Sequence, residues 1–357
     1  MTHPFAERLM AWYRRHARPL PWRNTRNPYY IWLSEIILQQ TRVVQGQDYY
    51  LKFIETFPDV FALAKADEQQ VLRLWQGLGY YTRARNLHYT AQYIATELNG
   101  KFPDTYQQLL QLRGVGKYTA AAIASFAFEE PVAVVDGNVY RVLARYFGEE
   151  TDIASPKAYA TFFALAQSLL PADQSATFNQ AMMEFGAMQC VPVSPKCMFC
   201  PFQLECVAFA TGRQAQLPVK QKKTKVRPRY FHYVVLRSEE GDVWLKPRTS
   251  NDIWKGLFDF YLVEGENEVV MESALLNDPL ISSLRKEGTE ESLSKQYVHI
   301  LSHQKIYARF HTFVASGSLI ERLVEKNAPG LRKIAADELT AYPLPVLIDK
   351  YLKETHF

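Results

Sequence analysis

Between the N-terminus and Met188, apolar residues recur at the spacing of amphipathic helices. Together with stop signals such as Asn99-Gly100, the pattern predicts helices over residues 29–53, 60–66, 68–76, 82–98, 104–112, 117–128, 138–147, 156–170 and 175–188. The first helix follows Asn27-Pro28, because proline is favoured in a first helical turn. Only residues 132–135 are ambiguous between helix and strand. We therefore expect an all-α region with short connections.

After residue 229 the pattern changes to alternating apolar and polar positions with many β-branched residues, which is typical of strands. It predicts strands over residues 230–237, 243–247, 258–263 and 306–314. Helical spacing returns near residues 271–276, 320–327 and 345–354. Since roughly 130 residues is an ordinary domain size, we expect an α+β domain over residues 230–357.

Length and composition agree with a multidomain globular protein. The chain has 357 residues, which suggests two or three domains. Apolar residues make up 48% of it and charged residues 22%, which excludes a disordered, collagen-like or fibrous chain. No apolar run approaches the roughly 20 residues that span a bilayer, and the N-terminus lacks the apolar part of a secretory signal. We expect a cytoplasmic protein with no membrane association.

The net charge of +4 is concentrated in one segment. Residues 217–229 contain no acid, so the rest of the chain has a small net negative charge. The basic residues of the segment are Lys220, Lys222, Lys223, Lys225, Arg227 and Arg229. We interpret residues 217–229 as a solvated linker that separates an N-terminal region, residues 1–216, from the C-terminal domain. It either lies near a polyanion or is a hinge that touches nothing.

All the cysteines of the chain lie in one loop, at Cys190, Cys197, Cys200 and Cys206. Disulfide scaffolds are smaller and have more dispersed cysteines, so the loop indicates a metal site. Structural zinc sites usually pair two CxxC or CxxH knuckles across a longer loop, whereas thiolates close together in one loop can surround a [4Fe–4S] cluster. The spacing C-x6-C-x2-C-x5-C favours the cluster and leaves zinc as the alternative.

Gly114-Val115-Gly116 separates two predicted helices and indicates a tight hairpin. Glycine lets backbone N–H groups approach an anion closely, and a DNA phosphodiester fits without any reading of bases. A turn between two helices needs glycine in any case, so this motif alone does not establish DNA binding.

Two carboxylic acids stand out. Glu35 lies inside an apolar helical stretch, where burial would raise its pKa and let it act as an acid near neutral pH. The alternative is an ordinary solvated or paired helix carboxylate. Asp136 precedes a predicted helix, and aspartate is a favoured helix N-cap, so its ordinary role is capping.

Taken together, these segments resemble the helix-hairpin-helix DNA glycosylases that have a Gly/Pro…Asp loop and a [4Fe–4S] loop. The resemblance is closer still to the adenine DNA glycosylases of the MutY type, and it covers nearly the whole chain. The most specific matches, besides the cysteine loop, are Leu20-Pro21-Trp22-Arg23, Trp32-Leu33-Ser34-Glu35, Gln39-Gln40-Thr41, Gly77-Leu78-Gly79-Tyr80-Tyr81, Gly114-Val115-Gly116, Val135-Asp136-Gly137-Asn138-Val139 and Phe178-Asn179-Gln180-Ala181. It implies an all-α helix-hairpin-helix glycosylase region with an iron–sulfur loop, followed by an α+β Nudix-like domain.

The resemblance implies a monomeric, nucleoid-associated DNA repair enzyme. Its substrate would be double-stranded DNA in which adenine is mispaired with 8-oxoguanine or guanine. Glu35 would protonate the adenine and Asp136 would stabilise the cationic sugar, as paired carboxylates do in glycosidases. Tyr118 and Asn138 would support these two carboxyl groups.

The resemblance also assigns binding residues. The reacting atoms of a stacked adenine are inaccessible, so such enzymes flip the base out of the helix. The pocket for the flipped base would be lined by Arg18, Leu20, Trp22, Arg23 and Gln180. Contacts to DNA and to the lesion would come from Gln40, Thr41, Leu78, Tyr80, Gly114, Gly116, Ser302 and His303. The cysteines Cys190, Cys197, Cys200 and Cys206 would hold one [4Fe–4S] cluster.

Departures from the pattern of related proteins decide finer points. Endonuclease III-like relatives form a Schiff base through a lysine on the helix after the hairpin, where this chain has Tyr118. A tyrosine cannot form an imine, so we expect water to complete the reaction, with little or no strand cleavage. In the Nudix-like part, Leu301-Ser302-His303 stands where the family usually has Phe-Ser-His. The glutamate-rich metal-binding run of a working Nudix hydrolase is missing, so we expect no pyrophosphohydrolase activity.

Two alternative functions remain. An endonuclease III-like pyrimidine glycosylase and lyase is disfavoured by Glu35, Tyr118 and the additional C-terminal domain. A non-catalytic DNA-binding protein that senses redox state through its cluster is disfavoured because both Glu35 and Asp136 are present.

Overall fold

The computed structural model describes residues 3–221, 226–265, 267–287 and 289–355. The chain divides into two compact units: residues 1–65 with 86–222, and residues 66–85 with 223–357. We call these the first and the second unit. The predicted fold class, a helical region followed by an α+β domain, is confirmed. The predicted boundaries at residues 216 and 229 stay a prediction, and Lys222, Lys223 and Lys225 lie outside the described residues.

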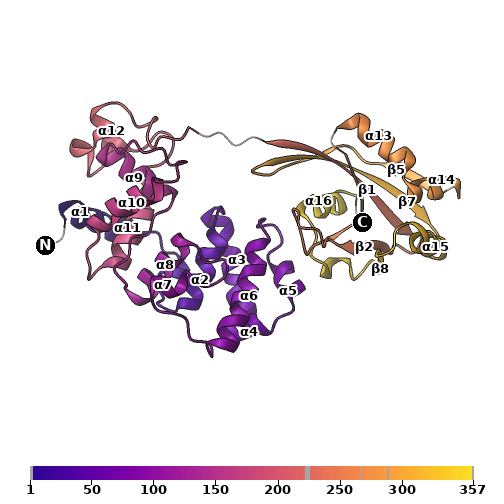
Figure 1. Ribbon diagram of the computed structural model, residues 1–357, viewed down its shortest axis with the longest axis horizontal. Helices are drawn as coiled ribbons and strands as arrows, with labels where there is room; N and C mark the ends of the chain where they lie inside the picture. Colours follow the sequence, from indigo (N-terminus) through magenta and orange to yellow (C-terminus); the bar gives the residue numbers. More distant parts are fainter. Residues whose placement is uncertain (1–2, 222–225, 266, 288, 356–357) are drawn as a thin grey trace. The chain divides into compact units, whose positions relative to one another are not determined.

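The first unit is helical. Its elements are α1(Pro4–His16), η1(Pro21–Arg23), α2(Pro28–Leu38), α3(Val43–Thr56), α4(Val60–Lys65), α6(Thr82–Glu97), whose first turn belongs to the second unit, α7(Tyr106–Leu109), α8(Lys117–Phe128), α9(Gly137–Phe147), α10(Ala158–Leu169), α11(Ser175–Met188), η2(Cys197–Phe199), η3(Gln203–Glu205) and α12(Val207–Ala210). Helix α2 packs on α3 and α8, and α11 packs on α1, α8 and α9 (Figure 1). One apolar core, which includes Phe5, Phe162, Phe178 and Phe185, joins α1 to α9, α10 and α11.

The helix predicted over residues 29–53 is wrong, because α2 ends at Leu38 and α3 begins at Val43. Gln40 between them has φ of 56°, a left-handed conformation that no helix continues through. Apolar spacing is maintained across this break, so periodicity alone could not reveal it. The prediction over residues 104–112 also reduces to the short α7, and α1 had not been predicted.

The second unit contains a mixed sheet and its own helices. The strands are β1(Arg227–Ser238), β2(Val243–Pro247), β3(Phe258–Asp259), β4(Tyr261–Gly265), β5(Glu290–Leu293), β6(Tyr297–Ile300), β7(Gln304–Ala315) and β8(Arg332–Ile334). The helices are α5(Glu68–Leu74), α13(Glu268–Asn277), α14(Pro279–Lys286), α15(Gly317–Asn327), η4(Leu339–Ala341) and α16(Val346–Glu354). The strand predicted over residues 258–263 is two strands, and β5, β6 and α14 had not been predicted.

Strands β1 and β7 form the centre of the sheet. They run parallel side by side over twelve residues each, from the pair Arg227–Gln304 to the pair Ser238–Ala315 (Figure 1). The order is β3-β2-β1-β7-β5, with β4 also paired to β1 and β6 to β7. Alternate residues of these strands are buried, as the period-two pattern predicts. Within the described residues, none of the helices has the length and apolar character needed to cross a membrane.

Candidate active site

A buried carboxylic acid, Glu35, lies where α2 packs on α8. Glu35 is 5% exposed, and Tyr118 Oη donates a 2.5 Å hydrogen bond to Glu35 Oε2. Burial raises the pKa of Glu35 from 4.5 to about 7, although the Tyr118 hydrogen bond lowers it; the charge of Asp136 adds to the rise. A carboxyl group that keeps its proton near neutral pH can donate that proton to a substrate.

Asp136 caps the N-terminus of α9. Its Oδ1 accepts hydrogen bonds from the backbone N–H groups of Asn138 and Val139, both at 2.8 Å, and its Oδ2 accepts one from Asn138 Nδ2 at 2.7 Å. The capping role expected from sequence is therefore present. Burial raises the pKa of Asp136 above its usual value, although these hydrogen bonds and Arg141 lower it in part. In its ionised form this carboxylate can stabilise a positive charge that develops beside it.

The predicted catalytic residues share one site. The charge of Asp136 raises the pKa of both Glu35 and Tyr118, which places the three groups within electrostatic reach. Lys117, which precedes Tyr118 in sequence, is exposed, and its ammonium group lies 4.6 Å from the centre of the Tyr159 ring. The amine next to Tyr118 is thus occupied by a cation–π contact.

Two arginines predicted for the base pocket are joined by a carboxylate that sequence analysis missed, Glu184 on α11. Arg18 donates to Glu184 Oε1 from Nε at 2.8 Å and to Oε2 from Nη2 at 2.6 Å. Arg23 donates from Nη2 to Oε2 at 2.8 Å and from Nε to Gln180 Oε1 at 3.2 Å. Burial alone would raise the pKa of Glu184, but these hydrogen bonds outweigh it and lower the pKa to about 2.

This cluster lies near Glu35, because the charge of Arg23 lowers the pKa of Glu35. Leu20 and Trp22 are each 6% exposed, and Trp22 packs edge-on against Tyr50 at 5.3 Å. Leu20 and Trp22 lie between Arg18 and Arg23 in the sequence, and both are buried. A sequence signal for Glu184 did exist, since it is an acid in a mostly apolar helix, as Glu35 is.

The glycine hairpin lies between α7 and α8. Gly114 has φ of 79°, and a Cβ atom there would come within 2.7 Å of Asn86 Cβ, so glycine is required for both reasons. Gly116 caps α8, and a Cβ atom there would meet nothing within 4 Å. The hairpin thus leads directly into the N-terminus of α8, where backbone N–H groups can bind an anion.

Two residues predicted to contact DNA have left-handed backbones. Gln40 has φ of 56° and Tyr80 has φ of 49°, which is uncommon outside glycine and tends to mark functional positions. Both side chains are exposed. Thr41 Oγ1 donates to the backbone carbonyl of Gln39 at 3.3 Å. Leu78, by contrast, is 8% exposed, so it contributes to packing in this structure.

Ser302 and His303 lie at the exposed tip of the hairpin between β6 and β7, which is closed by a 2.8 Å hydrogen bond from Leu301 N–H to the Gln304 carbonyl. Within the second unit, Tyr80 Oη contacts Ser302 Oγ. Both residues line a cleft of about 550 Å³. Its walls include residues 77–82, 252–255 and 299–304.

The cysteine loop follows α11 and holds four free, half-buried thiols. Burial raises the pKa of Cys200 to about 11, and the charges of Cys190, Cys206 and Cys197 add to the rise, so the thiols lie within electrostatic reach of each other. Within the described parts of the chain, no three metal-ligating side chains converge as a single ion requires. Four thiol groups in one loop form a donor set that fits an iron–sulfur cluster.

Two arginines of α9 bind this loop. Arg145 is 3% exposed and donates from Nη1 to Cys190 Sγ at 3.5 Å and to the Val191 carbonyl at 2.8 Å. Arg141 donates from Nε to the Cys190 carbonyl at 2.7 Å and from Nη2 to Asn138 Oδ1 at 2.8 Å. Arg141 therefore connects the loop directly to the asparagine that bonds Asp136.

The chain is similar to known DNA repair proteins. Residues 33–167 match the HhH-GPD superfamily of base excision DNA repair proteins, and residues 232–354 match the NUDIX domain. The chain is 36% identical over 268 residues to the adenine DNA glycosylase of Buchnera aphidicola from Acyrthosiphon pisum, covering 75% of this chain and 76% of the relative. It is 34% identical over 310 residues to the adenine DNA glycosylase of Buchnera aphidicola from Baizongia pistaciae, covering 86% and 85%.

A solved structure of a thermostable thymine-DNA glycosylase superposes with a TM-score of 0.54 and 30% identity. The superposition covers 58% of this chain and 95% of that one. The two Buchnera relatives are both named adenine DNA glycosylase. The chain therefore belongs to the adenine DNA glycosylase family, and it is a DNA glycosylase, a hydrolase of base excision repair.

Proposed function

We propose that this enzyme excises adenine paired with 8-oxoguanine or guanine in double-stranded DNA and leaves the DNA strand uncut. The observation that carries the proposal is Glu35, a buried acid on a family-specific segment with a pKa of about 7. Such an acid is half protonated near neutral pH and can convert adenine into a neutral leaving group.

In the proposed reaction the two carboxyl groups have different roles. The adenine enters a pocket lined by Arg18, Leu20, Trp22, Arg23 and Gln180. Glu35 gives its proton to a ring nitrogen of the base. The N-glycosidic bond then breaks with its electron pair going to the adenine, and the Asp136 carboxylate stabilises the cationic sugar. Water adds to the sugar and loses a proton to a carboxylate, which leaves free adenine and an abasic site.

Tyr118 supports the absence of strand cleavage, because its hydroxyl is engaged with Glu35 and it has no amine to form an imine. The neighbouring Lys117 points to the Tyr159 ring. With no amine available at this position, water completes the reaction.

Several features support the assigned DNA contacts. The glycine hairpin at Gly114 and Gly116, which leads into the N-terminus of α8, suits a phosphodiester. Gln40 and Tyr80, exposed and left-handed, suit insertion into the duplex beside the lesion. Ser302 and His303, at the exposed hairpin tip, offer hydrogen bonds to 8-oxoguanine, and the contact between Tyr80 and Ser302 supports their shared role.

Cys190, Cys197, Cys200 and Cys206 would hold one [4Fe–4S] cluster. When bound, the cluster supplies four iron–sulfur bonds that cross-link the loop. Arg141 and Arg145 hold that loop on α9, so the cluster has a structural part in placing Asp136. We further propose that the enzyme works as a monomer on the nucleoid DNA of the cytoplasm.

One assay tests the proposal. The purified protein is incubated with duplexes that contain a single 8-oxoguanine:adenine, guanine:adenine or thymine:adenine pair, and alkali-labile breaks are mapped. Breaks opposite the lesion only after alkali, faster for 8-oxoguanine than for thymine, are expected, and Glu35→Gln should retain binding without excision. Absence of adenine release overturns the assignment. A borohydride-trapped adduct that is lost in Lys117→Ala would overturn the absence of lyase activity.

A further inference from the structure

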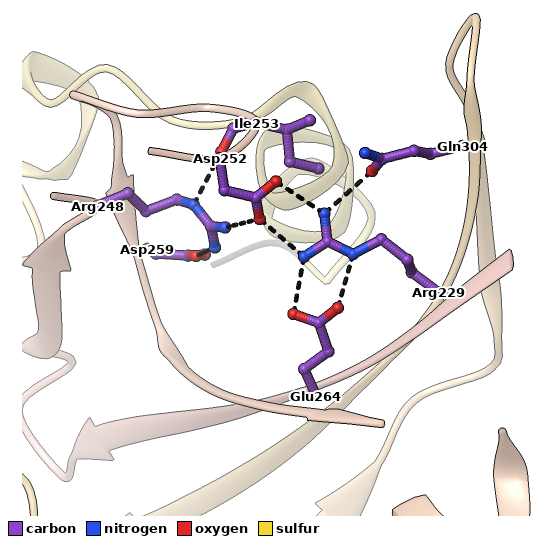
Figure 2. Close-up of polar contacts among 7 residues, drawn as sticks. All are labelled: Arg229, Arg248, Asp252, Ile253, Asp259, Glu264 and Gln304. Atoms are coloured by element: carbon purple, nitrogen blue, oxygen red, sulfur yellow. Dashed lines mark hydrogen bonds and ion pairs between the residues drawn. The ribbon is translucent and has the colours of Figure 1, made fainter. Parts of the chain in front are cut away.

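Arg229, which sequence analysis placed on a solvated linker, is a buried residue of strand β1. Its side chain is 9% exposed, and it lies at the centre of a polar network (Figure 2). Nε and Nη2 donate to Glu264 at 2.6 and 2.7 Å, and Nη1 and Nη2 donate to Asp252 at 3.0 and 2.7 Å. Nη1 also donates to Gln304 Oε1 at 3.0 Å. All five donors of the guanidinium group are therefore used.

The partners of Arg229 come from three separate segments. Glu264 lies on β4, the strand that pairs with β1. Asp252 lies in the connection between β2 and β3, and Gln304 begins β7 directly after Ser302 and His303. Asp252 and Gln304 both line the cleft of about 550 Å³ described above. One side chain thus joins two lining residues of this cleft, Asp252 and Gln304, to Glu264 on β4.

The wall that contains Asp252 is held by a second arginine. Arg248 donates from Nη2 to Asp252 Oδ2 at 3.2 Å, from Nη1 to the buried Asp259, and from Nε to the Ile253 carbonyl at 3.2 Å (Figure 2). Trp254 follows with φ of 61° and its ring centre 5.6 Å from that of His299. The wall therefore contacts the strand that leads into the Ser302–His303 hairpin.

Stability alone gives little reason for such a network. Moving charged groups out of water is costly, and well-packed apolar residues often stabilise a fold as well as buried ion pairs do. A fully bonded guanidinium group instead fixes the positions of its partners, because its planar array of N–H donors binds them in one arrangement only. The hairpin is further aligned by a 2.9 Å hydrogen bond from Arg227 N–H to the His303 carbonyl.

We propose that Arg229 is a positioning residue for reading of the lesion: through Gln304 it holds the Ser302–His303 hairpin in the geometry that binds 8-oxoguanine. The inference rests on the proposed function, because it assigns a selective role to this hairpin. It concerns recognition of the base opposite adenine and leaves the chemistry at Glu35 and Asp136 unchanged.

The test uses a matched pair of variants at Gln304 in the full chain. Gln304→Met keeps the size of the side chain but removes the acceptor, whereas Gln304→Glu keeps an acceptor for Arg229. Single-turnover excision is measured over a range of enzyme concentrations on 8-oxoguanine:adenine and guanine:adenine duplexes. For Gln304→Met we expect about tenfold weaker half-saturation on the 8-oxoguanine duplex, the usual effect of losing one hydrogen bond to a charged group.

The rate constant at saturation and all values on the guanine duplex should stay unchanged, and Gln304→Glu should restore wild-type behaviour. Arg229→Lys should weaken half-saturation at least as much as Gln304→Met, since lysine lacks the fork. Arg285→Lys is the control, because Arg285 also forms a two-bond pair, with Glu291, but is 41% exposed and away from the cleft.

Three results for Gln304→Met would overturn the inference. They are an equal weakening of half-saturation on both duplexes, a changed rate constant at saturation, and no change at all. If Arg229→Lys does not fold, the two Gln304 variants decide the question alone. A wild-type enzyme that excises adenine equally from both duplexes would instead overturn the proposed lesion preference, which distinguishes the two failures.

Discussion

The hydroxyl group of Tyr118 donates a 2.5 Å hydrogen bond to Oε2 of the buried Glu35. This bond connects the first turn of α8, directly after the glycine hairpin, to the acid on α2. Burial raises the pKa of Glu35 and the bond from Tyr118 lowers it, so the value of about 7 is a balance between the two. The pKa of Glu35 can therefore be changed either by altering its burial or by removing the Tyr118 hydroxyl group.

The pH dependence of excision should report this balance. Because Glu35 must be protonated to act, the single-turnover rate constant should fall about tenfold for each pH unit above 7. Measurements at saturating enzyme across the neutral and alkaline range would check this. A rate constant that stays level well above pH 7 would contradict Glu35 as the acid.

The free energy of unfolding should depend on pH through Glu35. The pKa of Glu35 is raised in the folded state, so its contribution to the free energy of unfolding is complete below 4.5 and is lost as pH rises through 7. Glutamine stays uncharged at every pH. The free energy of unfolding of Glu35→Gln minus that of wild type should therefore be about 3 kcal/mol larger well above pH 7 than below pH 4.5. Denaturant unfolding at both pH values measures it, and a pH-independent difference would refute the burial effect.

Tyr118→Phe removes the hydroxyl group but keeps the ring. Since the lost hydrogen bond favours the ionised form, the pKa of Glu35 should rise and the alkaline limb of the rate profile should move to higher pH. The plateau should fall as well, because the carboxyl group is less well oriented. The check is the full pH–rate profile; an unshifted limb would show that Tyr118 does not set the acid strength. Tyr159→Phe, at the Lys117 contact, is the control.

Glu184→Gln breaks a buried ion pair on one side only. Glu184 is fully buried and bound by Arg18 and Arg23, so the variant should lose about 3 kcal/mol of unfolding free energy. Its lowered pKa means that the stabilisation is present above 4.5 and lost as pH falls toward 2, and the variant should lack this dependence. Glu129→Gln, at the exposed pair with Arg26, should cost less than about 0.5 kcal/mol. Similar losses in both variants would contradict the buried pairing.

Arg141→Lys tests the connection between the cysteine loop and Asp136. Lysine cannot reproduce the forked contacts to the Cys190 carbonyl and Asn138, so both loop retention and excision should suffer. We expect a lower iron content and a single-turnover rate constant reduced by about tenfold. Arg213→Lys, at an exposed pair with Glu150, is the control. A variant with full iron content and full rate would show that the connection is dispensable.

Local patterns in the sequence determined much of this protein. A glycine pair between two helical stretches is enough to predict the hairpin, because few other residues tolerate the φ of Gly114. An acid inside an apolar helix, as at Glu35, predicts burial and a raised pKa, and an aspartate before a helix predicts the cap formed by Asp136. The turn and the cap depend on neighbours within a few residues, so the sequence contains them directly. The burial of Glu35 also required the packing of α2 on α8.

Other features were decided only by tertiary structure. The apolar spacing over residues 29–53 does not indicate the break at Gln40, where a left-handed backbone separates α2 from α3. Glu184 accepts hydrogen bonds from Arg18, which is 166 positions away in the sequence. The sequence predicts Arg229 as part of the linker. In the fold it lies on β1 and donates hydrogen bonds to Asp252, Glu264 and Gln304. The partners of a charged side chain are set by chain folding over long distances, and no local spacing encodes them.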